Sequence, residues 1–150
     1  MRSRLALMGL GLLVALRLST RLVWADVSEE ADLREAIVLA CHYEMGEFGV
    51  SAVQNCIESE TAALTALSAY PDASRPVVTR CTRDMQHHGW AMVKACVDQD
   101  LAAEDALQHY SSEDQTLVSS CRAQLSRQGP AKVKACVDRQ MSARAGGGKP

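Results

Sequence analysis

The chain has 150 residues, which is the length of a single domain. Its formal net charge is −2 and lysine and arginine form no cluster, so nucleic acid is not expected as a partner. Only 4% of the residues are aromatic, so the core has to be built from aliphatic side chains, methionine and cystine. A modest core of this kind gains most from covalent crosslinks.

Residues 1–25 are predicted to be a secretory signal peptide. Arg2 and Arg4 form a short basic region, Leu5 to Leu16 is an apolar run, and Val23-Trp24-Ala25 is a small-x-small cleavage site. Removing this segment with its four arginines would change the net charge from −2 to −6. The apolar run is too short to span a bilayer, so no stable membrane span is expected in the mature chain, and an uncleaved tether is the alternative. We expect a periplasmic or secreted protein.

All six cysteines follow one repeating pattern. They form three pairs of equal separation, and successive pairs begin 40 positions apart: Cys41 and Cys56, Cys81 and Cys96, Cys121 and Cys136. A fixed period of this size is typical of repeat architectures. Evenly used cysteines behind an export signal indicate disulfides formed in an oxidising compartment.

Apolar residues recur with helical spacing around every cysteine, and no segment alternates with period two, so the sequence predicts an all-α fold. A glycine follows the first cysteine of each pair by eight residues and is expected to end a helix in the left-handed conformation, at Gly49, Gly89 and Gly129. The predicted helices are, in chain order, 27–47, 50–69, 76–88, 90–109, 113–127 and 130–143.

We therefore expect one domain over residues 26–144, made of three tandem helix-turn-helix hairpins. The expected units are about 27–70, 71–110 and 111–144, and residues 145–150 are expected to be a disordered tail.

The cysteines of a pair lie at nearly equal distances from the glycine between them. Equidistant positions face each other in an antiparallel helix pair, so each unit is predicted to hold its own disulfide: Cys41–Cys56, Cys81–Cys96 and Cys121–Cys136. Linking neighbouring units instead would leave Cys41 and Cys136 to join across the whole array. The alternative of metal or redox chemistry finds no C-x-x-C motif in the sequence.

This arrangement resembles the cysteine-stapled helix-hairpin repeats of bacterial exported proteins. It is also similar to twin-cysteine helical-hairpin proteins, although those carry two cysteines on each helix where this chain carries one. No motif assigns the chain to a named family, and no functional residue is transferred to it.

Function is expected to be non-enzymatic, in protein interaction or structure, since the sequence has no G-x-S-x-G elbow or phosphate loop and no cofactor is implied. Trp90 and Met92 are the candidate partner-binding residues, because Trp90 is not copied in the other units and an exposed Trp can anchor a partner. The alternative is a metal- or cofactor-binding periplasmic protein that uses His87 and His88, which are adjacent imidazoles in a turn.

Overall fold

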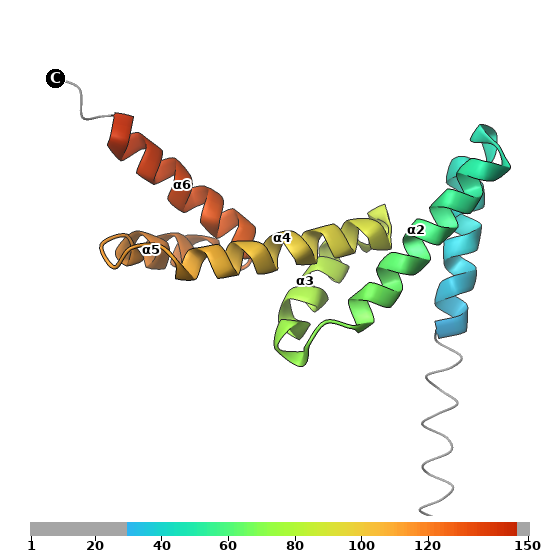
Figure 1. Ribbon diagram of the computed structural model, residues 1–150, viewed down its shortest axis with the longest axis horizontal. Coiled ribbons are helices and arrows are strands. Elements are labelled where there is room, and N and C mark those ends of the chain that lie inside the picture. Colours follow the sequence, from blue (N-terminus) through green and yellow to red (C-terminus); the bar gives the residue numbers. More distant parts are fainter. Residues whose placement is uncertain (1–29, 147–150) are drawn as a thin grey trace, which may run out of the picture. The chain divides into compact units, whose positions relative to one another are not determined.

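The computed structural model describes residues 30–146. These residues form helices and no strand, which confirms the all-α prediction (Figure 1). No helix in this range has the length and apolarity needed to cross a membrane. The predicted signal peptide at 1–25 lies outside the described residues.

The observed helices overlap the six predicted ones. The first occupies residues 30–45 of the described range, and it is followed by α2 (Val50–Ser68), α3 (Arg75–Met85), α4 (Trp90–Gln108), α5 (Gln115–Leu125) and α6 (Pro130–Gly146). Short 3-10 turns at Gly46–Phe48, Asp72–Ser74 and Gln86–His88 separate some of them.

The end of α6 differs from the expectation. The helix continues through Gly146, so the first two residues of the segment expected as a disordered tail are helical. Residues 147–150, the rest of that segment, lie outside the described part of the chain.

The chain divides into two compact units, Met1–Glu58 and Ser59–Pro150. The described part of the first unit is the helix over 30–45, the turn Gly46–Phe48 and the start of α2. Its core consists of Ile37, Cys41 and Val53, all less than a tenth exposed.

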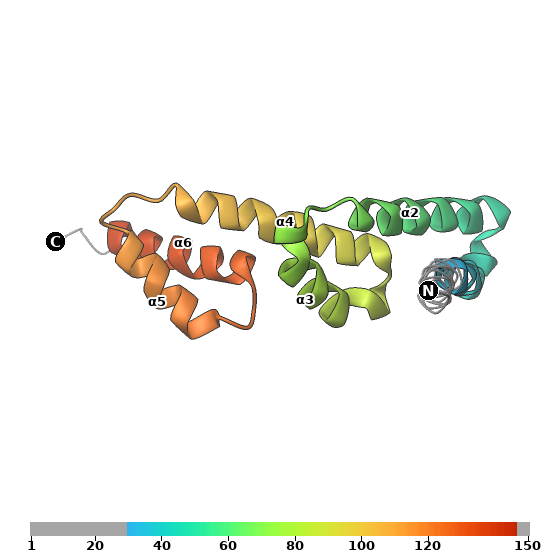
Figure 2. The same ribbon diagram turned by 90° about the horizontal axis from the view of Figure 1, so that it is seen from below.

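The second unit holds two apolar clusters, each built on a pair of antiparallel helices (Figure 2). The pair α3 and α4 encloses Cys81, Val93 and Val97, and the residue Leu67 of α2 joins this cluster. The pair α5 and α6 encloses a second cluster, which Leu107 of α4 joins in the same way. In both helix pairs of the second unit, the apolar core therefore includes a leucine from the helix that precedes the pair in the chain.

The three predicted turn glycines do have positive φ angles, of 93° at Gly49, 95° at Gly89 and 89° at Gly129. The conformation of Gly49 and Gly89 differs from the expected one. Their ψ angles are 172° and 163°, which belong to an extended region open essentially to glycine alone and not to the left-handed helix. Both residues end a helical segment, as the C-caps of the 3-10 turns Gly46–Phe48 and Gln86–His88, and Gly89 is also the N-cap of α4.

Candidate functional site

Three disulfides cross the helix pairs, and they join the pairs that the cysteine spacing predicts. Their Sγ–Sγ distances are 2.00, 2.06 and 2.04 Å, and their Cα atoms lie 5.7, 5.8 and 6.0 Å apart, in the order Cys41–Cys56, Cys81–Cys96, Cys121–Cys136. These Cα separations fall in the usual range for disulfides. The first cysteine of each pair is at most 1% exposed, so the bonds lie within the apolar cores.

One of the disulfides lies beside a buried ion pair. Asp100 of α4 is only 3% exposed, and its carboxylate pairs with the guanidinium of Arg80. The same guanidinium contacts the Sγ atom of Cys81 at 3.1 Å and reaches Asp84 at 3.4 Å. Because a buried carboxylate is costly without a counter-charge, Arg80 supplies the partner that this buried position requires.

The carboxylate of Asp100 also caps the helix of the following pair. Its Oδ1 accepts a hydrogen bond from the backbone N–H of Ala131 at 3.0 Å, in the first turn of α6. Glu60 of α2 performs the same role at α4, where it accepts from the N–H groups of Trp90 and of Ala91. A negative charge at a helix N-terminus is favoured because it satisfies free N–H groups and complements the helix dipole.

A tyrosine at the end of one helix and an aspartate on the next helix form a second set of contacts. The hydroxyl of Tyr70 donates to Asp98, and that of Tyr110 donates to Asp138. Lys94 also pairs with Asp98, at 2.6 Å, and its hydrogen bond is the main reason that the pKa of Asp98 is lowered. Burial and the hydrogen bond to Asp98 together raise the pKa of Tyr70 to about 12.

A surface groove of about 420 Å³ lies where α3, α4 and the start of α6 meet. The larger apolar side chains of its lining are Met85 and Met92, of which Met92 is 48% exposed. The ion pair of Arg80 and Asp100 forms a polar part of the same lining. The groove thus combines exposed methionine surface with an ion pair.

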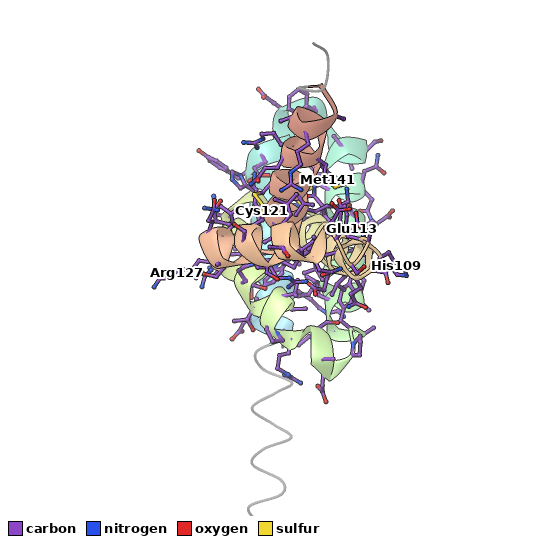
Figure 3. The ribbon with its side chains drawn as sticks, turned by 90° about the vertical axis from the view of Figure 1, so that its left-hand side faces the viewer. His109, Glu113, Cys121, Arg127 and Met141 are labelled. Carbon is purple, nitrogen blue, oxygen red and sulfur yellow. A yellow bond between two sulfur atoms is a disulfide. The ribbon has the colours of Figure 1, made fainter. Side chains whose placement is uncertain are left out.

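Two further cations belong to the groove. Arg127, which follows α5, and Lys132, in the first turn of α6, both line it. Neither takes part in an ion pair among residues 30–146. Figure 3 shows Arg127 extending outwards beyond the end of α5. An acidic group on a bound molecule would therefore find two cations whose charges are available.

The structure separates the residues that the sequence analysis selected. Met92 lines the groove, but Trp90 does not; Trp90 is partly buried and packs against the cluster of Leu67 and Cys81. His87 and His88 are exposed in the 3-10 turn before α4, with their ring centroids 3.9 Å apart. No group of three or more His, Cys, Asp or Glu side chains suited to a metal ion occurs in the described residues.

The sequence analysis did not identify the cations of the groove or the carboxylate caps. Arg80, Arg127 and Lys132 have no counterpart of the same charge at the matching positions of the other cysteine pairs, so the 40-residue period does not single them out. The caps carried a weak signal, because Glu60 and Asp100 are acids at matching positions.

A comparison of the chain with protein-family models, curated proteins and solved structures finds no match.

Proposed function

We propose that this chain is an exported, non-enzymatic protein-interaction module that binds a protein partner in the groove containing Met92. The observation that carries the proposal is that half-exposed Met92 shares one concave surface with Arg127 and Lys132, which form no ion pair within residues 30–146. Methionine and arginine are enriched at protein interfaces, and methionine adapts its shape to different partners. The partner would present an apolar side chain to the two methionines and a carboxylate to the cations.

The architecture proposed for this module is an array of three disulfide-pinned helical hairpins with a period of 40 residues. Support comes from the regular placement of the three disulfides and from the paired contacts made by Glu60 and Asp100, and by Tyr70 and Tyr110. In such arrays each unit contacts its neighbours, and the stacked helices offer an extended surface for binding.

Export to the periplasm or the exterior is proposed with it. The sequence of residues 1–25 supports this, as do three disulfides that would persist in an oxidising compartment. An alkaline phosphatase fusion, which is active only outside the cytoplasm, tests the proposal. Activity with residues 1–25 present and none without them is the expected result.

Site-specific photocrosslinking in the native cell envelope tests the groove. A photoreactive residue at Met92 should trap a discrete partner, whereas the same residue at Asp105, exposed on α4 but outside the groove, should not. The double variant Arg127→Glu/Lys132→Glu should weaken trapping at position 92, because it reverses the charge facing the partner's acid. Identical products from positions 92 and 105, or trapping that ignores the charge reversal, would contradict the groove as the binding site.

A further inference from the structure

The two helix pairs of the second unit are each covered by the helix that precedes them. At α3 and α4, the covering segment of α2 contributes Glu60 to the start of α4 and Leu67 to the core, and Tyr70, just after α2, bonds Asp98. At α5 and α6, α4 and the residues after it contribute the matching set, Asp100, Leu107 and Tyr110. The covering helix thus has a fixed chemistry: an acid, a leucine seven residues later and a tyrosine three residues after that.

The first helix pair has the receiving surface for such a helix, but residues 30–58 contain nothing that covers it. Val50, at the start of α2, is 87% exposed. Ile57 is only partly buried, whereas Val97 and Val137 at the matching positions are 0% exposed. Val38 is 37% exposed, whereas the matching Val78 is partly buried and the matching Val118 is 3% exposed. We call Val38, Val50 and Ile57 the open face.

The polar contacts of a covering helix are missing at the same place. A Cβ atom built on Gly89 or Gly129 would lie 2.8 or 2.6 Å from the capping carboxylate, whereas one built on Gly49 meets nothing within 4 Å. Glu58, which matches Asp98 and Asp138, accepts a hydrogen bond from Gln54 of its own helix and none from a tyrosine in the described residues. In the first helix pair, the apolar face, the start of the second helix and the acidic side chain of Glu58 therefore all lack the contacts that a covering helix makes elsewhere.

The described part of the first unit offers no helix for this face. Residues 70–74, before α3, form the break that lets the covering helix fold back, but the matching residues 30–34 belong to the first helix. Among the described helices of a second copy, α6 is the one that no further helix pair follows; there Gln140 stands at the position of the acid and bonds the sulfurs of its own disulfide. In the sequence, Gly147 stands at the position of the leucine, so α6 does not repeat the chemistry of a covering helix.

We propose that the open face binds an amphipathic helix of a different protein, one that presents a carboxylate, a leucine seven residues later and an aromatic residue three residues after that. The carboxylate accepts from the N–H groups at the start of α2, next to Gly49. The leucine packs between Val38 and Ile57 and removes apolar surface from water. This helix-on-hairpin contact is distinct from the groove beside Met92 and supplies the chain with a second binding surface.

A peptide of this protein's own sequence serves as the probe. Residues 97–110, VDQDLAAEDALQHY, carry the acid, the leucine and the tyrosine at the required spacing. With a fluorescent label, the peptide should bind the oxidised full chain saturably, as measured by anisotropy. Replacing its leucine, Leu107→Ala in chain numbering, should weaken binding by about tenfold, since the buried anchor is lost.

Matched variants of the protein locate the site. Val50→Glu should weaken peptide binding by about tenfold or more, because its carboxylate repels the acid of the peptide at the start of α2. It should fold normally, because the side chain of Val50 is 87% exposed. Leu39→Glu is the control, since Leu39 is 64% exposed but the matching residues Thr79 and Ser119 stay exposed beside a covering helix. Met92→Glu should leave peptide binding unchanged, so failure of the groove proposal and failure of this one are distinguishable.

Three outcomes overturn the proposal. The peptide fails to bind; it binds equally to the Val50→Glu variant; or the protein alone dimerises with rising concentration in a way that Val50→Glu abolishes. The last result, measured by sedimentation equilibrium, would assign the open face to a second copy.

Discussion

The Oδ1 atom of Asp100 lies 3.0 Å from the backbone nitrogen of Ala131. The same carboxylate therefore caps α6 and forms an ion pair with the guanidinium of Arg80. Asp100→Ala should therefore destabilise the protein by about 3 kcal/mol, because it leaves the Arg80 guanidinium, 17% exposed, with only the longer contact to Asp84 at 3.4 Å. Glu60→Ala should cost only about 1 kcal/mol, because only a helix cap is lost. Urea unfolding of the oxidised proteins measures both.

The cost at Asp100 is expected to come mainly from the orphaned cation. Replacing both members, Arg80→Met with Asp100→Leu, should recover a large part of the stability lost in Asp100→Ala. If the double variant is as unstable as the single one, or if Asp100→Ala costs no more than Glu60→Ala, the ion pair is not what stabilises this contact.

Alanine at the turn glycines should show two separable effects. Gly49→Ala should cost about 1–3 kcal/mol, because alanine is strained at φ 93° even though its Cβ meets no atom within 4 Å. Gly129→Ala should cost more, because its Cβ would also lie 2.6 Å from Asp100. Thermal unfolding of the two variants gives the difference, and equal losses would show that the contact with Asp100 adapts without cost.

The sequence was sufficient for the helices and for the cysteine pairs because both depend on spacing. Apolar residues on one side of each helix place Cys81 and Cys96 on facing stripes, and Gly89 sets the turn between them. These features are repeated 40 residues later, so each copy supports the reading of the others. Spacing alone is enough when partners lie on one hairpin.

The contacts between neighbouring helix pairs were not predicted, and their geometry explains why. The carboxylate of Glu60 accepts a hydrogen bond from the backbone N–H of Trp90, 30 residues later in the chain. No local sequence pattern predicts such a contact. Trp90 was expected to be an exposed anchor because it is not repeated, but it packs against the core beneath that cap. A residue that departs from the repeat can bind a partner or can fill a gap in the core. Only the arrangement of the helices distinguishes these two roles.

Removing a disulfide should lower stability by a similar amount in each helix pair. Each bond has a sequence separation of 15, which corresponds to about 3 kcal/mol from restriction of the unfolded chain. The double variants Cys41→Ala/Cys56→Ala and Cys121→Ala/Cys136→Ala, compared by urea unfolding, test this. Non-reducing peptide mapping of the parent protein is the control, and a peptide joining Cys56 to Cys81 would contradict the observed pairing.

The exposed imidazoles His87 and His88 are not expected to retain a metal ion. Their rings lie side by side, but the described residues supply no third ligand of the usual types near them. Elemental analysis of the purified oxidised protein should find no stoichiometric metal, both for the parent and for His87→Ala/His88→Ala. Stoichiometric zinc or copper that disappears in the double variant would instead favour the metal-binding alternative.

Tyr70 should make the protein less stable in alkaline solution. Its pKa is about 12 in the fold against an ordinary value of 10.0, raised first by burial and then by the hydrogen bond to Asp98. Since the folded pKa is the higher one, the contribution to stability is fully present below pH 10 and is lost as the pH rises through 12. Tyr70→Phe should reduce both this decline and the tyrosinate absorbance that develops near pH 12. The part that remains comes from Tyr110, whose pKa is also raised, first by its hydrogen bond to Asp138. Tyr43→Phe, at a side chain 91% exposed, is the control and should retain both the decline and the late absorbance change.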